Sequence, residues 1–180
     1  QVVKNETHPC AATPPRVVGL WRFDEERWDG SPGEVVDSSG LGANGSAAGD
    51  ANARDPGRLC RGGLFDGMGD FVQINNLSSQ LNGSASLAFW IKTTQRGDNT
   101  AWRAPGVTGV EQSGGTDDIF WGWLDAAGRI GFAVGNDSST KSTISNSDGI
   151  WHHVVLTRAR TVGAAPSYTH WPLNPGRAIA

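Results

Sequence analysis

Long apolar runs are missing from the 180-residue chain, and so is any excess of basic residues. No window approaches the about 18 consecutive apolar residues that a membrane-spanning helix needs, so we expect no membrane insertion. The net charge is −3 at pH 7, with 15 lysines and arginines against 18 aspartates and glutamates. Proteins that bind a phosphate backbone usually present a basic face, and this composition offers none. Nucleic acid is therefore excluded as a predicted partner.

Cysteine is also scarce, because Cys10 and Cys60 are the two in the chain. Zinc sites usually use clustered Cys and His ligands at short spacing, which two distant cysteines do not supply. A disulfide between Cys10 and Cys60 is the favoured interpretation, and it would tether an N-terminal arm, residues 1–16, to the domain. Two free thiols are the alternative, because the redox compartment is not visible in the sequence.

Glycine, in contrast, is abundant, with 25 residues, and no segment has helical periodicity. Short apolar or alternating segments recur between turn signals, which is the pattern of strands in an all-β fold. At least six strands are predicted, within residues 17–23, 62–74, 85–94, 119–136 and 150–159. Two apolar runs within 119–136 flank a four-residue connection, Asp125–Gly128, that suits a hairpin. The predicted fold is a two-sheet antiparallel β-sandwich over residues 17–158.

Two segments fall outside this strand pattern. Residues 29–57 are rich in Gly, Ser, Ala and Asp, so we predict a long ordered loop with a functional role. Residues 159–180 contain three prolines that interrupt every strand the segment could form, and we predict an irregular tail there. On this interpretation the sandwich is incomplete at its C-terminal end.

Five segments, in this order, resemble the laminin-G-like branch of the concanavalin A-like lectin/glucanase superfamily. They are 20-LWRFDE-25, 37-DSSGLGANG-45, 63-GLFDGMGDFVQI-74, 87-LAFWIKT-93 and 151-WHHVVLTR-158. The resemblance implies a jelly-roll sandwich in a secreted or cell-surface protein. Within the family, residues 88–136 resemble the lectin-like domains of bacterial pilus biogenesis proteins. This implies a bacterial envelope setting, extracellular or periplasmic, with an envelope or pilus protein as a candidate partner.

The catalytic motif of the superfamily's glucanases is missing. Those enzymes carry paired acids in a Glu-x-Asp-x-x-Glu arrangement on one strand, and no two glutamates of this chain have that spacing with an aspartate between them. A Gly-x-Ser-x-Gly nucleophile elbow is missing as well. Because glycoside hydrolysis needs two carboxyl groups at a fixed separation, we predict no catalytic residue and no enzyme activity. A glycoside hydrolase is the less favoured alternative.

Oxygen-bearing side chains gather in the Gly-rich loops, and they suggest calcium as a structural cofactor. Asp37, Asn44, Asp66 and Asp70 offer carboxylate or amide oxygens beside free carbonyl groups, which is the ligand set that Ca²⁺ prefers. Metal-stapled loops are also frequent in the resembled family. The alternative is that Asp37 and Asp70 bond their own backbone and cap turns. Asp24, beside the first predicted strand, is a further candidate ligand.

A ligand surface is predicted in the connection 95–118. Trp102 would stack on a sugar ring, while Glu111, Gln112, Asp117 and Asp118 would accept hydrogen bonds from its hydroxyl groups. Core packing is the preferred role for four other tryptophans: Trp21, Trp90, Trp121 and Trp151. We expect Trp121 and Trp123, two residues apart, to share one face of their strand.

The predicted function is therefore a non-catalytic binding or adhesion module whose ligand is a glycan or a protein. A structural spacer that presents neighbouring modules is the alternative, because no sequence feature names the ligand.

Overall fold

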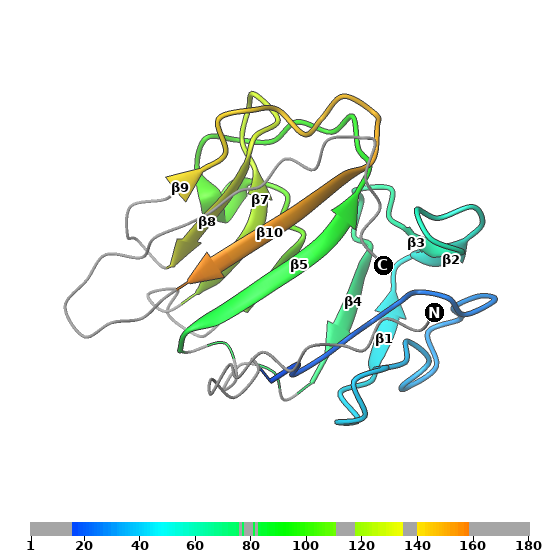
Figure 1. Cartoon of the computed structure of the whole chain (residues 1–180). Helices are drawn as coiled ribbons and strands as arrows, with labels where there is room; N and C mark the ends of the chain where they lie inside the picture. The colour runs from blue at the N-terminus through cyan, green and yellow to red at the C-terminus, as the bar shows by residue number, and fades with distance from the viewer. Residues whose placement is uncertain are drawn as a thin grey trace, which may run out of the picture.

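The computed structural model describes residues 16–75, 77, 81, 83–110, 118–134 and 140–158, which form an all-β domain (Figure 1). Ala101–Arg103 form a single 3-10 turn, η1, and no described helix is long and apolar enough to cross a membrane. The described strands are β1 (Gly45–Ala48), β2 (Asn52–Arg54), β3 (Gly62–Leu64), β4 (Phe71–Ile74), β5 (Ala85–Ile91), β6 (Thr108–Val110), β7 (Ile119–Leu124), β8 (Ile130–Val134), β9 (Thr140–Lys141) and β10 (His152–Arg158).

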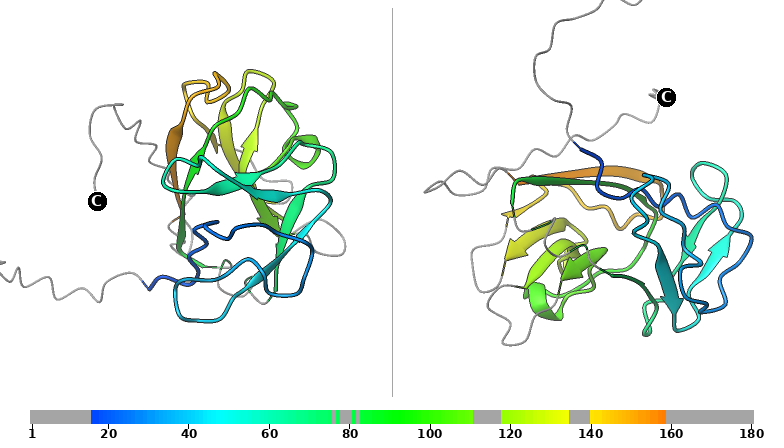
Figure 2. Two further views of the ribbon diagram at one scale, coloured as in Figure 1. Left: turned by 90° about the vertical axis from the view of Figure 1, so that its right-hand side faces the viewer. Right: turned by 90° about the horizontal axis from the view of Figure 1, so that it is seen from below.

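Two layers enclose the main core. β5 and β10 pair as one antiparallel sheet, and β6, β7, β8 and β9 form a four-stranded sheet in that order. The β5–β10 layer lies over the four-stranded sheet, as the view from below shows (Figure 2). Two further two-stranded sheets, β1–β4 and β2–β3, flank these layers. The predicted all-β, antiparallel sandwich is confirmed.

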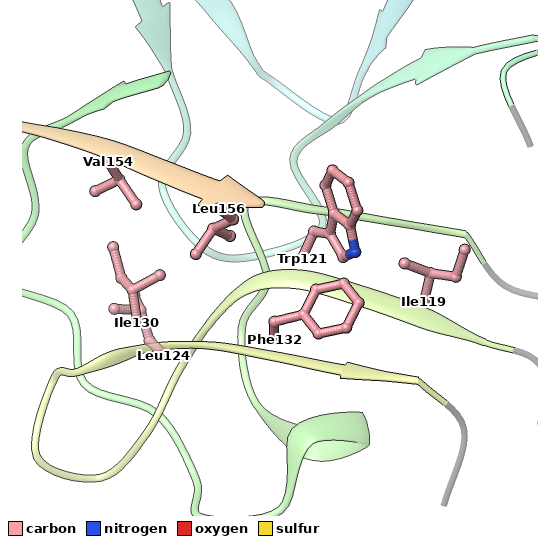
Figure 3. Packing of buried hydrophobic residues seen from close by; sticks show 7 residues of the cluster. All are labelled: Ile119, Trp121, Leu124, Ile130, Phe132, Val154 and Leu156. Carbon is pink, nitrogen blue, oxygen red and sulfur yellow. The ribbon is translucent and has the colours of Figure 1, made fainter. Parts of the chain in front are cut away.

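Apolar residues alternate along β5 and β10, and the register brings them to one face. Leu156 lies opposite Leu87, and Val154 lies opposite Phe89. These side chains and Ile91 meet the apolar side chains of the four-stranded sheet (Figure 3), which are Ile119, Trp121, Leu124, Ile130 and Phe132. The sequence-based expectation that β5 and β10 share one interior is therefore confirmed.

The β7–β8 hairpin turns at Asp125–Gly128, where the sequence predicts it. The N–H of Asp125 donates to the carbonyl of Arg129 at 3.0 Å, and the N–H of Gly128 donates to the carbonyl of Asp125 at 2.9 Å. Gly128 has a φ of +76°, a left-handed conformation that glycine adopts without steric cost.

A β-bulge at Gly122 separates two tryptophans that the sequence places on one face. The bulge, at a φ of +83°, shifts the register, so that Trp121 pairs with Phe132 but Trp123 pairs with Gly131. Paired residues of antiparallel strands point to the same face. Trp121 therefore enters the core, and Trp123 is buried against Gly131 on the opposite face. The prediction of a shared face was wrong because strict alternation fails where a bulge inserts an extra residue.

The predicted first strand is not a strand. Residues 17–23 pair with described backbone only around an isolated bridge between Trp21 and Asp37. The N–H of Leu20 donates to the side chain of Asp37 instead of to a neighbouring strand. An alternating pattern thus identified side chains suited to a strand, but pairing depends on a partner that the local sequence does not reveal.

Residues 29–57, predicted as a loop, contain β1 and β2. Their sequences, GSAA and NAR, lack the alternating large apolar residues that predict a strand, and at Gly45 the space is limited. A Cβ atom at Gly45 would lie 2.8 Å from Cγ1 of Val72 on the paired strand. A second apolar cluster forms around these strands, made by Trp28, Val35, Ala47, Ala51 and Ala53.

The predicted tryptophan positions are met in part. Trp121 is buried in the main core, whereas Trp21, Trp90 and Trp151 are half-buried. Trp28 is buried in the second cluster and was not predicted.

The predicted disulfide between Cys10 and Cys60 stays a prediction, because one of its two cysteines lies outside the described residues. Cys60 is exposed and carries a free thiol, while Cys10 lies outside the described residues. Cys60 lies between β2 and β3 and has a φ of +53°.

Candidate functional site

Three carboxylates converge at one turn of the flanking sheets. Asp66 and Asp70, two of the predicted metal ligands, meet Asp50, and one oxygen of each lies within 4.8 Å of the others. The two oxygens of Asp70 accept the N–H groups of Asp50 and Asp66, both at 2.8 Å. We call this group the Asp50–Asp66–Asp70 cluster.

The pKa values of Asp70 and Asp50 shift in opposite directions. Hydrogen bonds from the backbone lower the pKa of Asp70, with that from Asp66 the strongest. The Asp70 side chain, by direct contact and by its charge, raises the pKa of Asp50, and the charge of Asp66 adds to this effect. A cation bound here would relieve the repulsion, and hard divalent cations prefer carboxylate oxygens. The donor set of the described cluster therefore fits calcium.

Asp37 closes a turn instead of offering free oxygens. Its Oδ1 accepts the N–H groups of Leu20 and Ser39 at 2.9 and 2.8 Å, and its Oδ2 accepts the Ser39 hydroxyl and the Ala43 N–H at 2.7 and 3.0 Å. Burial acts to raise the pKa of Asp37, but these hydrogen bonds lower it well below its ordinary value. Asn44 takes part in the same turn, since its Oδ1 accepts the Asp37 N–H at 2.9 Å. These contacts are the ones expected if Asp37 caps a turn by bonding nearby backbone, which was the alternative to a metal ligand.

The four predicted metal ligands are not brought together. Asn44 lies beside the end of β1 that pairs with the last residue of β4, whereas Asp50 and Asp70 lie at the opposite end of this ladder. Asp24 accepts a backbone N–H elsewhere and is not part of the cluster. Asp50 was missed because it follows β1, which the sequence did not reveal as a strand.

Trp102 presents the exposed aromatic surface that the sequence predicts. Its side chain lies on η1 and is 66% exposed. η1 contacts β7 and β8, on the face of the sheet that points away from β10 (Figure 3). Asp118 is half-buried immediately before β7. The remaining predicted ligand contacts, Glu111, Gln112 and Asp117, lie outside the described residues.

The family comparison agrees with this architecture. A laminin G family model, described as the concanavalin A-like lectin/glucanases superfamily, matches residues 66–166, more than half of the chain. The chain belongs to this family. No curated protein and no solved structure matches it. Laminin-G-like domains serve as binding or structural modules, are commonly extracellular and are typically non-catalytic.

Among the residues that the structure describes in this laminin-G-like domain, the most buried charge lies in the β7–β8 turn. Asp125 has no exposed surface, and its Oδ1 accepts the N–H groups of Ala127 and Arg129 at 2.8 and 2.9 Å. Its Oδ2 lies 2.7 Å from Nη2 of Arg129 and 3.4 Å from Nζ of Lys141. Burial acts to raise the pKa of Asp125, but the hydrogen bonds and charge of Arg129 lower it to about 2. Oδ1 thus holds the turn itself, and Oδ2 joins the turn to β9 through Lys141.

The adjacent histidines of the laminin-G-like domain face opposite sides of β10. Nε2 of His152 lies 2.8 Å from Oδ1 of Asp148. The ring of His153 packs on Trp90 at a centroid distance of 4.9 Å, and the Arg58 guanidinium carbon lies 4.6 Å from the Trp90 ring. Each histidine has its own partner. Trp90, predicted for the core, instead lies beside His153 on the outer face of the β5–β10 layer.

Proposed function

We propose that the domain is a non-catalytic binding module of a secreted or envelope-associated protein and that it binds carbohydrate at Trp102. The observation that carries this proposal is the 66% exposure of the Trp102 indole on η1. Exposed indole faces pack against the C–H groups of sugar rings, which gives tryptophan a large contact area at little entropic cost. A position on a helix turn held against the four-stranded sheet keeps this face in a fixed orientation.

The resemblance of residues 88–136 to the lectin-like domain of the MSHA pilus biogenesis protein MshQ supports a finer setting. On this proposal the domain is one module of a bacterial pilus or envelope protein and contributes to adhesion. A glycan and an envelope protein are both candidate partners, and the exposed indole favours the glycan.

Calcium is the cofactor that we propose for the Asp50–Asp66–Asp70 cluster. Three carboxylates close to one another on glycine-rich turns supply negatively charged oxygens, and nearby carbonyl groups and water would complete the six to eight ligands that calcium takes. Asp37 and Asn44 are not part of this proposal, because Asn44 lies beside the other end of the β1–β4 ladder and Asp37 is hydrogen-bonded to it there.

Calcium titration tests the cluster. We expect binding in the range of extracellular modules, with a dissociation constant on the order of 10⁻⁴ to 10⁻³ M, and a weakening of about tenfold or more for Asp70→Asn. Asp29→Asn is the matched control, because Asp29 is also an exposed turn residue that accepts a backbone N–H. Because the pKa of Asp50 is raised, protons should compete with calcium as the pH falls, beginning above the ordinary value of 3.8. Equal calorimetric titrations of the Asp70 and Asp29 variants would contradict the site.

A glycan array tests the function of Trp102. We expect Trp102→Ala to weaken binding by on the order of tenfold, because it removes the stacking surface, and Trp102→Phe to retain most of the affinity. Thermal unfolding of the same variants should be nearly unchanged, since substitutions of exposed side chains usually have small effects on stability.

The alternatives predict different outcomes of this experiment. A structural spacer would bind no glycan, and deleting it would leave adhesion intact while the neighbouring modules remain displayed. A hydrolase would release reducing sugar from the polysaccharides it binds. Either result would replace the proposed binding function.

A further inference from the structure

We infer that the carbohydrate bound at Trp102 is acidic, an inference that rests on the proposed function. Arg103 follows Trp102 on η1, and its guanidinium carbon lies 5.2 Å from the centroid of the Trp102 ring. The side chain of Arg103 is about half exposed, at 55%. A permanent positive charge therefore lies over an exposed aromatic ring on one helix turn.

The guanidinium of Arg103 is held in place by one of its nitrogens. Nη2 donates to the Thr100 hydroxyl at 3.1 Å and lies 3.6 Å from Oδ1 of Asp98. Asp98 in turn accepts the N–H of Thr100 at 2.7 Å. Among the described residues, Nε and Nη1 of Arg103 have no hydrogen-bond partner. The group is thus oriented through Nη2, while its other donors remain available.

These free donors suit an anion better than a neutral hydroxyl group. Arginine pairs with carboxylate and sulfate-like oxygens through two parallel N–H donors, and such charge-assisted bonds are about twice as strong as neutral ones. A uronic acid or sulfated sugar could stack its ring on Trp102 and place its charged group on Arg103. The 3.6 Å contact with Asp98 is a long, exposed ion pair, which contributes little and which a ligand anion can replace.

Matched pairs of polysaccharides test the charge requirement. Polygalacturonate and alginate would each be compared with their methyl esters, and a sulfated galactan with its desulfated form, at one calcium concentration. We expect each acidic polymer to bind about tenfold more tightly than its neutral form, which is the effect of one charge-assisted hydrogen bond. Arg103→Gln should remove this preference. Asp98→Asn should strengthen binding to the acidic forms, because it removes the competing carboxylate.

Arg58→Gln provides the matched control, since Arg58 also lies over a tryptophan, Trp90, but on a different surface. It should change neither affinity nor preference. Equal binding of acidic and neutral forms, or an equal loss for the Arg58 and Arg103 variants, would overturn the acidic ligand while leaving carbohydrate binding intact. Binding to none of the polymers, or binding unaffected by Trp102→Ala, would overturn the proposed function itself.

Discussion

Asp125→Ala is expected to lower the free energy of unfolding by about 3 kcal/mol at neutral pH, because it removes one partner of a buried ion pair. The side chain has no exposed surface and accepts two backbone N–H groups of its own turn. Its loss would leave those donors without a partner and Arg129 and Lys141 without a counter-charge. Asp125→Asn should cost less, because the amide oxygen can still accept the backbone hydrogen bonds. Urea unfolding at pH 7 measures both differences.

The pH dependence separates the charge of Asp125 from its hydrogen bonds. The pKa of Asp125 is lowered to about 2 in the folded domain from an ordinary value of 3.8. The ionised side chain therefore contributes its stability above about pH 4, and this contribution is lost as the pH falls through 2. The difference between the native domain and Asp125→Asn should be largest above pH 4 and should shrink as pH 2 is approached. A difference that stays constant across this range would show that charge is not the cause.

The sequence predicts those strands that bury one face. β5, β8 and β10 carry large apolar residues at alternating positions, β7 is a short apolar run, and all four appear where the pattern indicates. β1 and β2 escaped prediction because neither carries large apolar residues at alternating positions, and at Gly45 a side chain would collide with the neighbouring strand. Residues 17–23 show the opposite case, in which an apolar pattern is present but the described chain supplies no strand beside it.

The candidate site residues were likewise predicted where the local sequence suffices and missed where tertiary structure brings them together. Trp102 was predicted because a tryptophan in a polar, glycine-rich connection has no apolar face to join, and its exposure agrees. Asp66 and Asp70 were predicted from their own turn, but Asp50 reaches them only through the pairing of β1 with β4. The contact of Arg103 with Trp102 was also missed. Two neighbouring residues in the sequence can be predicted to stack only when the helix turn that carries them, η1, is known.

Trp121→Ala should be among the most damaging substitutions, with a loss of about 3 to 5 kcal/mol, the range for truncating a buried tryptophan or phenylalanine. The side chain is 1% exposed and contacts Phe132 at a centroid distance of 5.3 Å. Its removal opens a cavity between the two layers that the surrounding strands can only partly fill. Domains of this size are stable by about 5 to 15 kcal/mol, so the variant should have a much lower unfolding midpoint. Thermal and urea unfolding provide the measurement.

Trp102→Ala is the natural comparison, because it makes the same chemical change at a side chain that is 66% exposed. We expect its stability to stay within about 0.5 kcal/mol of the native domain, since it opens no cavity. Should Trp121→Ala fail to fold, Trp121→Phe keeps an aromatic ring in the core and should show a smaller loss of the same kind. Equal stability losses at Trp102 and Trp121 would contradict the assignment of one indole to the core and the other to the surface. Carbohydrate binding should show the reverse order, because the surface indole is the one available to a ligand.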